Sequence, residues 1–65
     1  MKIREFRESK NMTQDELASL LSVNRSSVAM WETGQNYPTV KKLIQIAEIF
    51  GCTLDDLIDK EIKST

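Results

Sequence analysis

Apolar residues along the chain recur at spacings of three and four, which is the pattern of amphipathic helices. The first such segment, Lys2 to Lys10, places Ile3 and Phe6 on one face and charged residues elsewhere, and it stops near Asn11. No stretch shows the two-residue alternation of a strand, and no internal repeat or low-complexity linker interrupts the pattern. The sequence therefore predicts an all-α fold built from short helices.

A capping box marks the start of the second helix. In Thr13-Gln14-Asp15-Glu16, the Thr13 hydroxyl and the Glu16 carboxylate can each accept a hydrogen bond from a backbone N–H at the helix start. The helix is expected to end at about Leu21, where Ser22 takes a turn that glycine makes more easily. We expect this helix to bury Leu17, Ala18 and one of Leu20 and Leu21.

Three further helices follow, and each begins after a polar capping residue. The third is expected from Arg25 to Thr33, with Asn24 as its N-cap and Gly34 just past its end. The fourth is expected from Val40 to Phe50, and a fifth opens at Thr53. The apolar residues expected to face the core are Val28, Trp31, Leu43, Ile46, Ala47, Phe50, Leu57 and Ile58.

The second and third helices are separated by only three residues, Ser22 to Asn24. Two short helices joined by such a turn have helix-turn-helix spacing, in which the later helix projects far enough to enter a DNA major groove about 12 Å wide. Ala18 is small enough to let the two helices cross closely, and Val23 fills the angle between them. Residues 13–33 therefore predict a DNA-binding motif.

Length and composition limit the alternatives. With 65 residues the chain has room for one domain with one core, and we interpret residues 1–65 as that domain, with 62–65 expected to fray. No apolar run approaches the roughly 18 residues that span a bilayer, and the N-terminal residues do not form the apolar block of a signal peptide. The sequence thus predicts a cytoplasmic protein without a membrane partner.

Catalytic and metal-binding residues are scarce. The chain has no histidine and a single cysteine, Cys52, which can form no internal disulfide and has no second ligand beside it. We interpret Cys52 as a small buried hydrophobe. Because no serine is paired with a base either, we expect no enzyme activity, and no cofactor, metal or small-molecule ligand.

The charges are distributed unevenly. The net charge of −1 argues against a nucleic-acid partner, because basic residues that neutralise phosphates supply most non-specific affinity. However, residues 1–11 hold four basic and two acidic residues, whereas residues 48–65 hold five acidic and two basic residues. One end of the molecule can therefore face phosphates while the acidic end points away.

Residues that carry a family resemblance extend along almost the whole chain in the correct order. They are Ile3, Arg4, Glu5, Phe6, Arg7, Thr13, Gln14, Trp31, Glu32, Thr33, Gly34, Tyr37, Pro38, Leu43, Ile46, Ala47, Phe50, Gly51, Leu54 and Leu57. With them the chain resembles the phage Cro and lambda-repressor type of helix-turn-helix domain. The resemblance implies a compact five-helix domain, with the motif formed by helices two and three, that represses transcription by binding an operator in duplex DNA.

Carried over to matching positions, the resemblance makes Arg25 the main base-reading residue, through bidentate hydrogen bonds to guanine O6 and N7. The alternative for Arg25 is a phosphate contact that carries no sequence information. Ser26 can bond a base or a phosphate, and Ala29 and Met30 offer apolar contact to a thymine methyl. Met30 alternatively packs on the surface of the domain.

The resemblance also implies phosphate contacts on both sides of the third helix, whose N-terminus presents free N–H groups and a positive dipole end. Gln14 is expected to anchor a phosphate and to bridge to the third helix; otherwise it is an ordinary surface residue. Lys41, like Lys42, alternatively only solvates the start of the fourth helix. The further expected contacts are Asn24, Ser27, Gln35, Asn36, Tyr37 and Lys41, with amides and side chains of the loop clamping a phosphate.

Two structural assignments complete the resemblance. Arg7 and Glu32 match positions that form an internal ion pair in similar domains. The family's two-fold contact commonly involves the C-terminal helix, and this chain has more isoleucines than a small core can hide. We nominate Leu54, Ile58 and Ile62 for a homodimer interface, although Ile62 alternatively closes the bottom of the core.

Three features depart from the family pattern: Ser22 in place of glycine, a single cation on the outward face of the third helix, and the acidic balance. The last two predict weak binding by a monomer, and hence binding as a dimer on half-sites about 10 bp apart or as several dimers side by side. They also leave open a second hypothesis, a helix-turn-helix module that has lost DNA binding and docks a protein partner such as a toxin or another regulator. Fold alone does not decide between the two.

Overall fold

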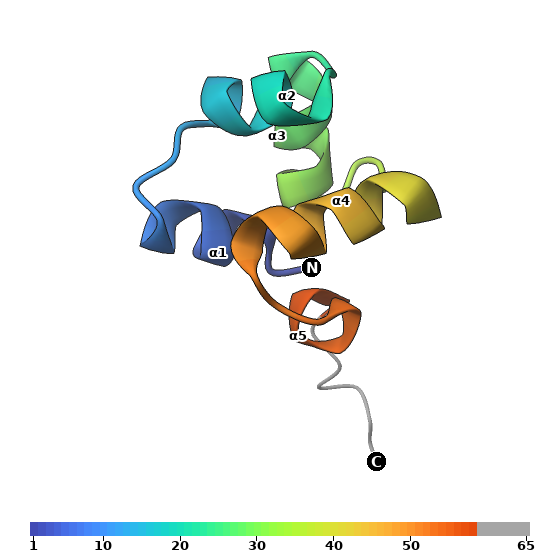
Figure 1. Cartoon of the computed structure of the whole chain (residues 1–65). Helices are drawn as coiled ribbons and strands as arrows, with labels where there is room; N and C mark the ends of the chain where they lie inside the picture. The colour runs from blue at the N-terminus through green and yellow to red at the C-terminus, as the bar shows by residue number, and fades with distance from the viewer. Residues whose placement is uncertain (59–65) are drawn as a thin grey trace.

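Five helices make up most of residues 1–58, the part of the chain that the computed structural model describes (Figure 1). They are α1 (Ile3–Ser9), α2 (Gln14–Leu21), α3 (Arg25–Thr33), α4 (Val40–Phe50) and α5 (Leu54–Ile58). The predicted all-α fold is confirmed. Helix α1 is one residue shorter at each end than expected, and α5 begins one residue after Thr53.

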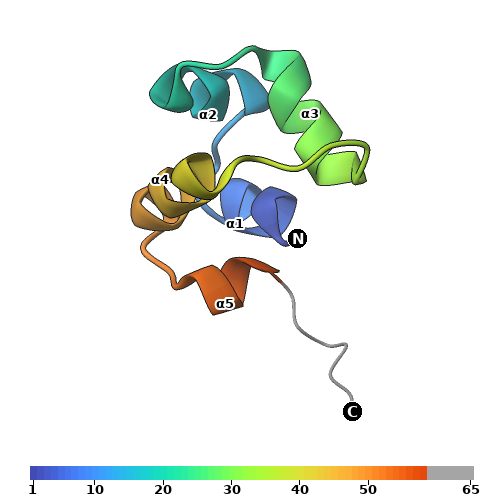
Figure 2. The ribbon, with the colours of Figure 1, turned by 90° about the vertical axis from the view of Figure 1, so that its right-hand side faces the viewer.

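The helices form two levels above α5. In Figures 1 and 2, α2 lies at one end of the molecule, α1 and α4 cross the middle, and α5 lies at the opposite end. Helix α3 descends from the level of α2 along one side, and the loop to α4 continues that side (Figure 2). The N-terminus is tied to α5, because the Lys2 amide donates a 2.8 Å hydrogen bond to the Leu57 carbonyl.

The core forms where all five helices meet. Its buried residues are Ile3, Leu17, Ala18, Leu21, Val28, Trp31, Ile46, Phe50 and Leu57. The Phe6 and Phe50 rings stack with centroids 5.7 Å apart, which joins α1 to the end of α4. Burial of these side chains supplies the main driving force for folding, as it does in small domains generally.

The structure decides which of the expected apolar residues face the core. The sequence left open whether Leu20 or Leu21 is buried in α2; Leu21 is buried, while Leu20 is 59% exposed. The expectation that Ile58 faces the core is wrong, because Ile58 is 40% exposed and Leu57 alone of the last two residues of α5 is buried. Adjacent side chains on a helix point about 100° apart, so with Leu57 facing the core, Ile58 is turned toward its edge.

The helix ends follow the capping residues. At α2 both bonds of the capping box form: Thr13 Oγ1 accepts from the Glu16 amide at 3.0 Å, and Glu16 Oε1 accepts from the Thr13 amide at 2.8 Å. Thr53 and Asp56 make the same reciprocal pair before α5. These side chains satisfy backbone donors that a helix start leaves unpaired.

The turn after α2 is left-handed, as expected. Ser22 has φ 58° and ψ 43°, a conformation in which a side chain is disfavoured and glycine is not. Its position is fixed by neighbouring bonds, among them the one from the Val23 amide to the Ala18 carbonyl at 3.0 Å. The chain therefore accepts local backbone strain in order to make the tight turn between α2 and α3.

Two predictions concern residues outside the described part. Ile62, nominated for the dimer interface, and the fraying expected at 62–65 both lie beyond residue 58. Among the residues that are described, no helix has the length and apolar character needed to span a bilayer.

Candidate nucleic-acid interface

Packing within the core fixes the angle between α2 and α3. Ala18 on α2 is 3% exposed, and Val23 in the turn is half-buried against the core. Val28 and Trp31 bury the inner face of α3. As a result the opposite face of α3 lies along one side of the molecule (Figure 2).

The outward face of α3 contains the four residues that were predicted to read bases. Arg25 and Ser26, in the first turn, are exposed, whereas Ala29 and Met30 are half-buried. Glu32, the acidic residue of α3, points inward with a side chain only 4% exposed. The exposed charge on this helix is therefore the single cation of Arg25.

The N-terminus of α3 is open. Asn24 has the extended backbone of an N-cap residue, with φ −76° and ψ 151°, but its side chain makes no capping bond. The Ser27 amide bonds back to the Asn24 carbonyl at 3.0 Å, and Ser27 itself is half-buried. Free N–H groups at a helix start, with the positive end of the helix dipole, favour an anion such as a phosphate.

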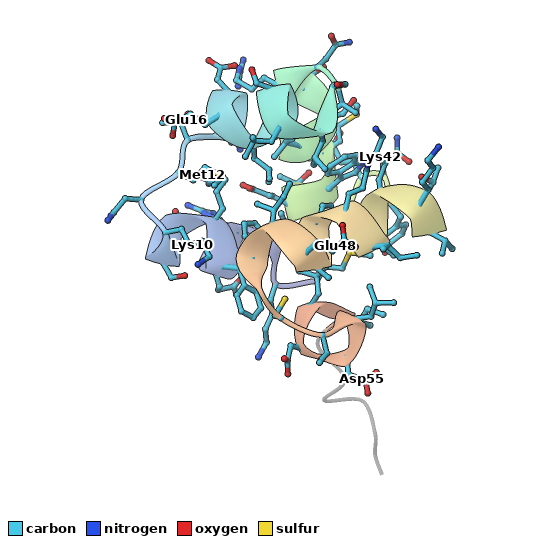
Figure 3. All side chains as sticks on the ribbon, in the orientation of Figure 1. Lys10, Met12, Glu16, Lys42, Glu48 and Asp55 are labelled. Atoms are coloured by element: carbon cyan, nitrogen blue, oxygen red, sulfur yellow. The ribbon has the colours of Figure 1, made fainter. Side chains whose placement is uncertain are left out.

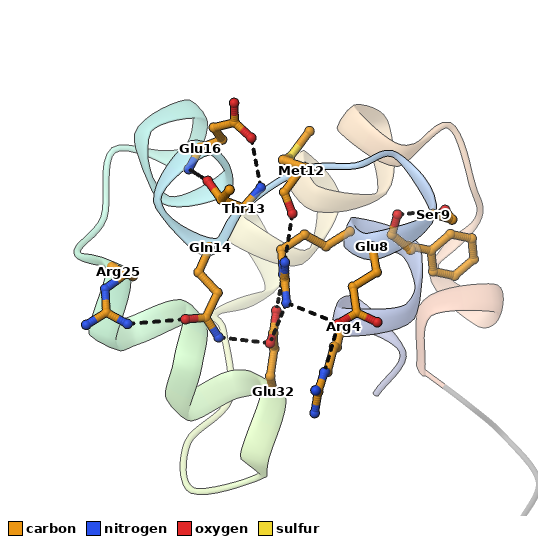
Figure 4. Close-up of polar contacts among 11 residues, drawn as sticks. Arg4, Glu8, Ser9, Met12, Thr13, Gln14, Glu16, Arg25 and Glu32 are labelled. Atoms are coloured by element: carbon orange, nitrogen blue, oxygen red, sulfur yellow. Dashed lines mark hydrogen bonds and ion pairs between the residues drawn. The ribbon is translucent and has the colours of Figure 1, made fainter.

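A chain of hydrogen bonds runs from α1 to the first residue of α3 (Figure 4). The Arg7 guanidinium donates to both carboxylate oxygens of Glu32, through Nε at 2.6 Å and Nη2 at 3.2 Å, and through Nη1 to the Met12 carbonyl at 2.7 Å. Gln14 donates from Nε2 to Glu32 Oε1 at 3.0 Å. In turn, Gln14 Oε1 accepts from Arg25 Nη1 at 3.3 Å.

The Arg7–Glu32 pair lies almost entirely inside the protein, with side chains 11% and 4% exposed. The hydrogen bond to Glu32 raises the pKa of Arg7, partly offset by burial, so the guanidinium stays charged. A charged guanidinium in this position needs its carboxylate partner, because an unpaired charge inside a protein is costly.

Gln14 has a fixed orientation as a result. The amide nitrogen must face the Glu32 carboxylate, since only the nitrogen can donate, and the carbonyl oxygen therefore faces Arg25. Sequence reasoning anticipated a bridge from Gln14 to α3 but missed its second partner, Glu32. The sequence pointed to an inward-facing Glu32 only through the expected Arg7–Glu32 ion pair, and it did not connect Glu32 with Gln14.

Asp15 also contacts Arg25. Its Oδ1 lies 3.8 Å from Arg25 Nε, and the two side chains are 79% and 58% exposed. Sequence reasoning assigned Asp15 only to the capping segment. It had no means to find this ion pair, because the two residues meet only once α2 and α3 are packed.

The loop after α3 presents side chains more than amides. The amides of Gln35 and Asn36 both donate to the Met30 carbonyl, at 3.0 and 3.3 Å, and the Tyr37 amide donates to Asn36 Oδ1 at 2.9 Å. The expected amide contribution to a phosphate clamp is therefore already used within the protein. The Gln35, Asn36 and Tyr37 side chains remain exposed, that of Tyr37 by 67%.

The two lysines of α4 differ. Lys41 is exposed, whereas Lys42 is half-buried and extends from α4 toward the helices above it (Figure 3). Its ammonium donates a 2.6 Å hydrogen bond to the carbonyl of Leu21. Only Lys41 is therefore placed as a solvent-facing cation behind the loop.

Cys52 is half-buried and packs against the core. Burial raises the pKa of the Cys52 thiol, and the Asp56 carboxylate raises it further, so the thiol stays protonated at neutral pH and is a poor nucleophile. In the part of the chain that the structure describes, no three side chains of the metal-ligating types lie together.

Comparison with known proteins agrees with this geometry. Residues 3–57 match the family model described as helix-turn-helix. BcrR of Enterococcus faecalis, named as an HTH-type transcriptional activator, is 38% identical over 60 residues, which cover 92% of this chain and 29% of BcrR. An uncharacterised HTH-type transcriptional regulator of Archaeoglobus fulgidus is 38% identical over 56 residues, covering 86% of this chain and 79% of that protein.

A third relative is AnsR of Bacillus subtilis, named as an HTH-type transcriptional regulator. It is 32% identical over 60 residues, which cover 92% of this chain and 52% of AnsR. The fold and site thus define a helix-turn-helix domain of the class found in transcriptional regulators. The chain belongs to the helix-turn-helix family, which confirms the resemblance seen in the sequence. It spans less than a third of BcrR and about half of AnsR.

Proposed function

We propose that this chain binds duplex DNA in a sequence-specific manner and regulates transcription, with α3 (Arg25–Thr33) inserted in the major groove. The observation that carries the proposal is the position of Arg25. It lies exposed in the first turn of a helix whose inner face is locked in the core, and Gln14 holds its guanidinium. A side chain so placed can reach a base edge while the helix stays rigid.

Arg25 is proposed to read guanine through its bidentate donors, and Ser26 to bond a neighbouring base or phosphate. Ala29 and Met30 are half-buried, so they offer small apolar surfaces suited to a thymine methyl and not to a polar base edge. Recognition would then rest on one strong polar contact in each half-site. This is consistent with the near absence of charge on the outward face.

Phosphate contacts are proposed to come from both sides of α3. Gln14, Asn24 and Ser27 lie at the N-terminal ends of α2 and α3, where helix dipoles favour an anion. On the other side, the contacts would come from the side chains of Gln35, Asn36, Tyr37 and Lys41. These contacts position the protein, and their loss would weaken binding to all sequences equally.

We further propose that the protein acts as a homodimer on an inverted repeat, in the manner of two-fold symmetric helix-turn-helix proteins. Leu54 and Ile58 leave 37% and 40% of their surface exposed on α5, and Ile44 leaves 45% on α4. Val40, one helical turn before Ile44, is 70% exposed and belongs to the same face of α4. A second copy would cover these apolar side chains.

Repression is the simplest regulatory outcome, since a dimer bound over a promoter excludes the polymerase. Such a protein would work in the cytoplasm, where the DNA is. BcrR, of which this chain matches 29%, is named as an activator, so activation is the other regulatory outcome.

One observation favours the alternative of a protein-interaction module. Leu20 is 59% exposed on α2 and borders an open groove that is also lined by Met12 and by Lys10 and Asn11, which follow α1. An exposed apolar side chain beside a groove suits a protein partner such as a toxin or another regulator. In that case DNA binding would be weak or absent.

The deciding experiment is a fluorescence-anisotropy titration with a random-sequence duplex pool at low salt, followed by selection and sequencing of the bound duplexes. An inverted repeat with half-site centres about 10 bp apart supports the proposal, and raising the salt should weaken the binding. If no duplex binds even at low salt, the protein-interaction module becomes the better explanation.

A further inference from the structure

Arg25 is held on two sides before any DNA is present. Gln14 Oε1 accepts from Nη1 at 3.3 Å, and Asp15 Oδ1 lies 3.8 Å from Nε. Gln14 is itself fixed by its bond to the inward-facing Glu32, so its oxygen is a fixed acceptor for Arg25. Within residues 1–58, Nη2 has no hydrogen-bond partner.

The two contacts engage different N–H donors of the Arg25 guanidinium and leave others available for DNA. A guanidinium carries five N–H donors, and its end-on edge consists of one hydrogen from Nη1 and one from Nη2. Asp15 occupies the side of Nε, and Gln14 takes one of the two Nη1 hydrogens. One hydrogen on Nη1 and both on Nη2 are therefore left for other acceptors, and guanine presents two acceptors in the major groove.

We propose that Asp15 is a positioning residue that determines specificity: its carboxylate holds the Arg25 guanidinium with the end-on edge toward the groove and keeps it from swinging to a phosphate. This inference rests on the proposed function, in which Arg25 reads guanine. An arginine held in one orientation contributes to binding where a guanine is present and little elsewhere. It also loses less conformational freedom on binding.

Asp15 has a second effect that also favours specific over non-specific binding. Its carboxylate is 79% exposed in the first turn of α2, close to the expected position of the DNA backbone, and so repels phosphates in every complex. The acidic residue thus lowers affinity for DNA in general while preserving the guanine contact. The ion pair is exposed and weak, which suits a contact that orients a side chain without burying it.

The test compares Asp15→Asn with Glu16→Gln in the full chain. Both variants remove one negative charge from the first turn of α2, but the Glu16 carboxylate bonds the Thr13 amide and glutamine can keep that bond. Binding is measured by anisotropy to the duplex recovered by selection and to a scrambled duplex of the same length. Selection from the random pool is repeated with each variant to give the base preference at each position.

We expect Asp15→Asn to bind the scrambled duplex about threefold to fivefold more tightly, without a matching gain on the selected duplex. The guanine enrichment at one position per half-site should fall. Glu16→Gln should change binding to the two duplexes by equal factors and leave the enrichment intact. Asp15→Glu, which keeps a carboxylate, should restore most of the enrichment.

The inference is overturned if Asp15→Asn and Glu16→Gln change the ratio of the two affinities equally. Arg25→Ala separates this failure from that of the proposed function. If Arg25→Ala abolishes the guanine enrichment while Asp15→Asn leaves it intact, Arg25 reads the base and Asp15 does not position it. If the wild type binds no duplex, or Arg25→Ala leaves the enrichment unchanged, the role of Arg25 and that of Asp15 fall together.

Discussion

The ammonium of Lys42 on α4 lies 2.6 Å from the backbone carbonyl of Leu21, the last residue of α2. The last carbonyls of a helix have no partner within the helix, and a cation beside them also interacts favourably with the negative end of the helix dipole. Lys42 therefore caps α2 from a different helix. Because Ser22 begins the turn to α3 at this point, the bond fixes the start of that turn.

Replacing Lys42 with methionine keeps the aliphatic stem and removes the ammonium. We expect the free energy of unfolding to fall by about 1–2 kcal/mol, since the Leu21 carbonyl loses a charged donor. Thermal unfolding followed by circular dichroism measures the change. The matched control is Lys41→Met, which removes the same charge from the exposed neighbour and should leave the melting temperature unchanged. Equal effects of the two substitutions would contradict the capping role.

Glu32→Ala tests the inward-facing ion pair. We expect the free energy of unfolding to fall by about 3 kcal/mol, because the substitution leaves the buried Arg7 guanidinium with only the Met12 carbonyl and the exposed Glu8 carboxylate, 3.9 Å from Nη2, as partners. A loss of this size is a large part of the stability of a small domain, so the melting temperature should drop steeply. Glu8→Ala removes the exposed partner of Arg4 and a carboxylate 3.9 Å from Arg7 Nη2, and it should cost less than about 1 kcal/mol because both of these ion pairs involve an exposed carboxylate. An unchanged melting temperature for Glu32→Ala would rule out a stabilising ion pair.

Ser22→Gly should stabilise the protein. Ser22 has φ 58°, where glycine has no steric penalty, and we expect a gain of about 1 kcal/mol in the free energy of unfolding. Ser19→Gly serves as the control. Ser19 is exposed in the interior of α2, where glycine lowers helix propensity and should destabilise by about 0.5 kcal/mol. Chemical denaturation of the two variants should therefore give changes of opposite sign, and a loss of stability in Ser22→Gly would be evidence against strain at the turn.

Local signals were sufficient to predict the helices of this chain. Thr13 with Glu16, and Gly34 and Gly51 after the helices they end, define boundaries through contacts within a few residues, so the sequence alone locates them. Tertiary contacts were harder to foresee. The bond from Lys42 to Leu21 joins residues 21 positions apart, and no periodicity encodes it.

The same distinction holds for the candidate interface. The helical wheel places Arg25 at the edge of the outward face of α3, but its partners Gln14 and Asp15 follow from the packing of α2 against α3. The loop was expected to offer free amides, and three of these are consumed by hydrogen bonds to the Met30 carbonyl and the Asn36 side chain. Such use of backbone donors depends on the loop conformation, which the residue types in 35–38 do not specify.

Arg25→Ala and Lys41→Ala should separate base reading from phosphate binding. Loss of Arg25 should cost about 1–3 kcal/mol on the preferred sequence and relax the preference at one position per half-site. Loss of Lys41, an exposed cation proposed to bind a phosphate, should weaken binding to all duplexes similarly and lower the salt dependence by about one phosphate contact. Titrations against the selected and scrambled duplexes at several salt concentrations distinguish the two. An equal loss on both duplexes for Arg25→Ala would assign it to a phosphate.

Ile58→Lys tests the proposed dimer. Because Ile58 is 40% exposed on α5, lysine can be accommodated in the monomer without burying its charge, and the melting temperature at low protein concentration should change little. In a two-fold interface the substitution appears twice, so two ammonium groups would be brought together in an apolar contact. We expect sedimentation equilibrium to show a shift from dimer to monomer, and affinity for the inverted repeat to fall toward that for a single half-site. Leu20→Lys changes a more exposed apolar residue, 59% against 40%, at the other end of the molecule and should leave the dimer intact. If Leu20→Lys dissociates the dimer and Ile58→Lys does not, the two-fold contact lies on α2 instead of α5, and the half-sites cannot be spaced as proposed, because α2 lies beside the DNA-reading helix.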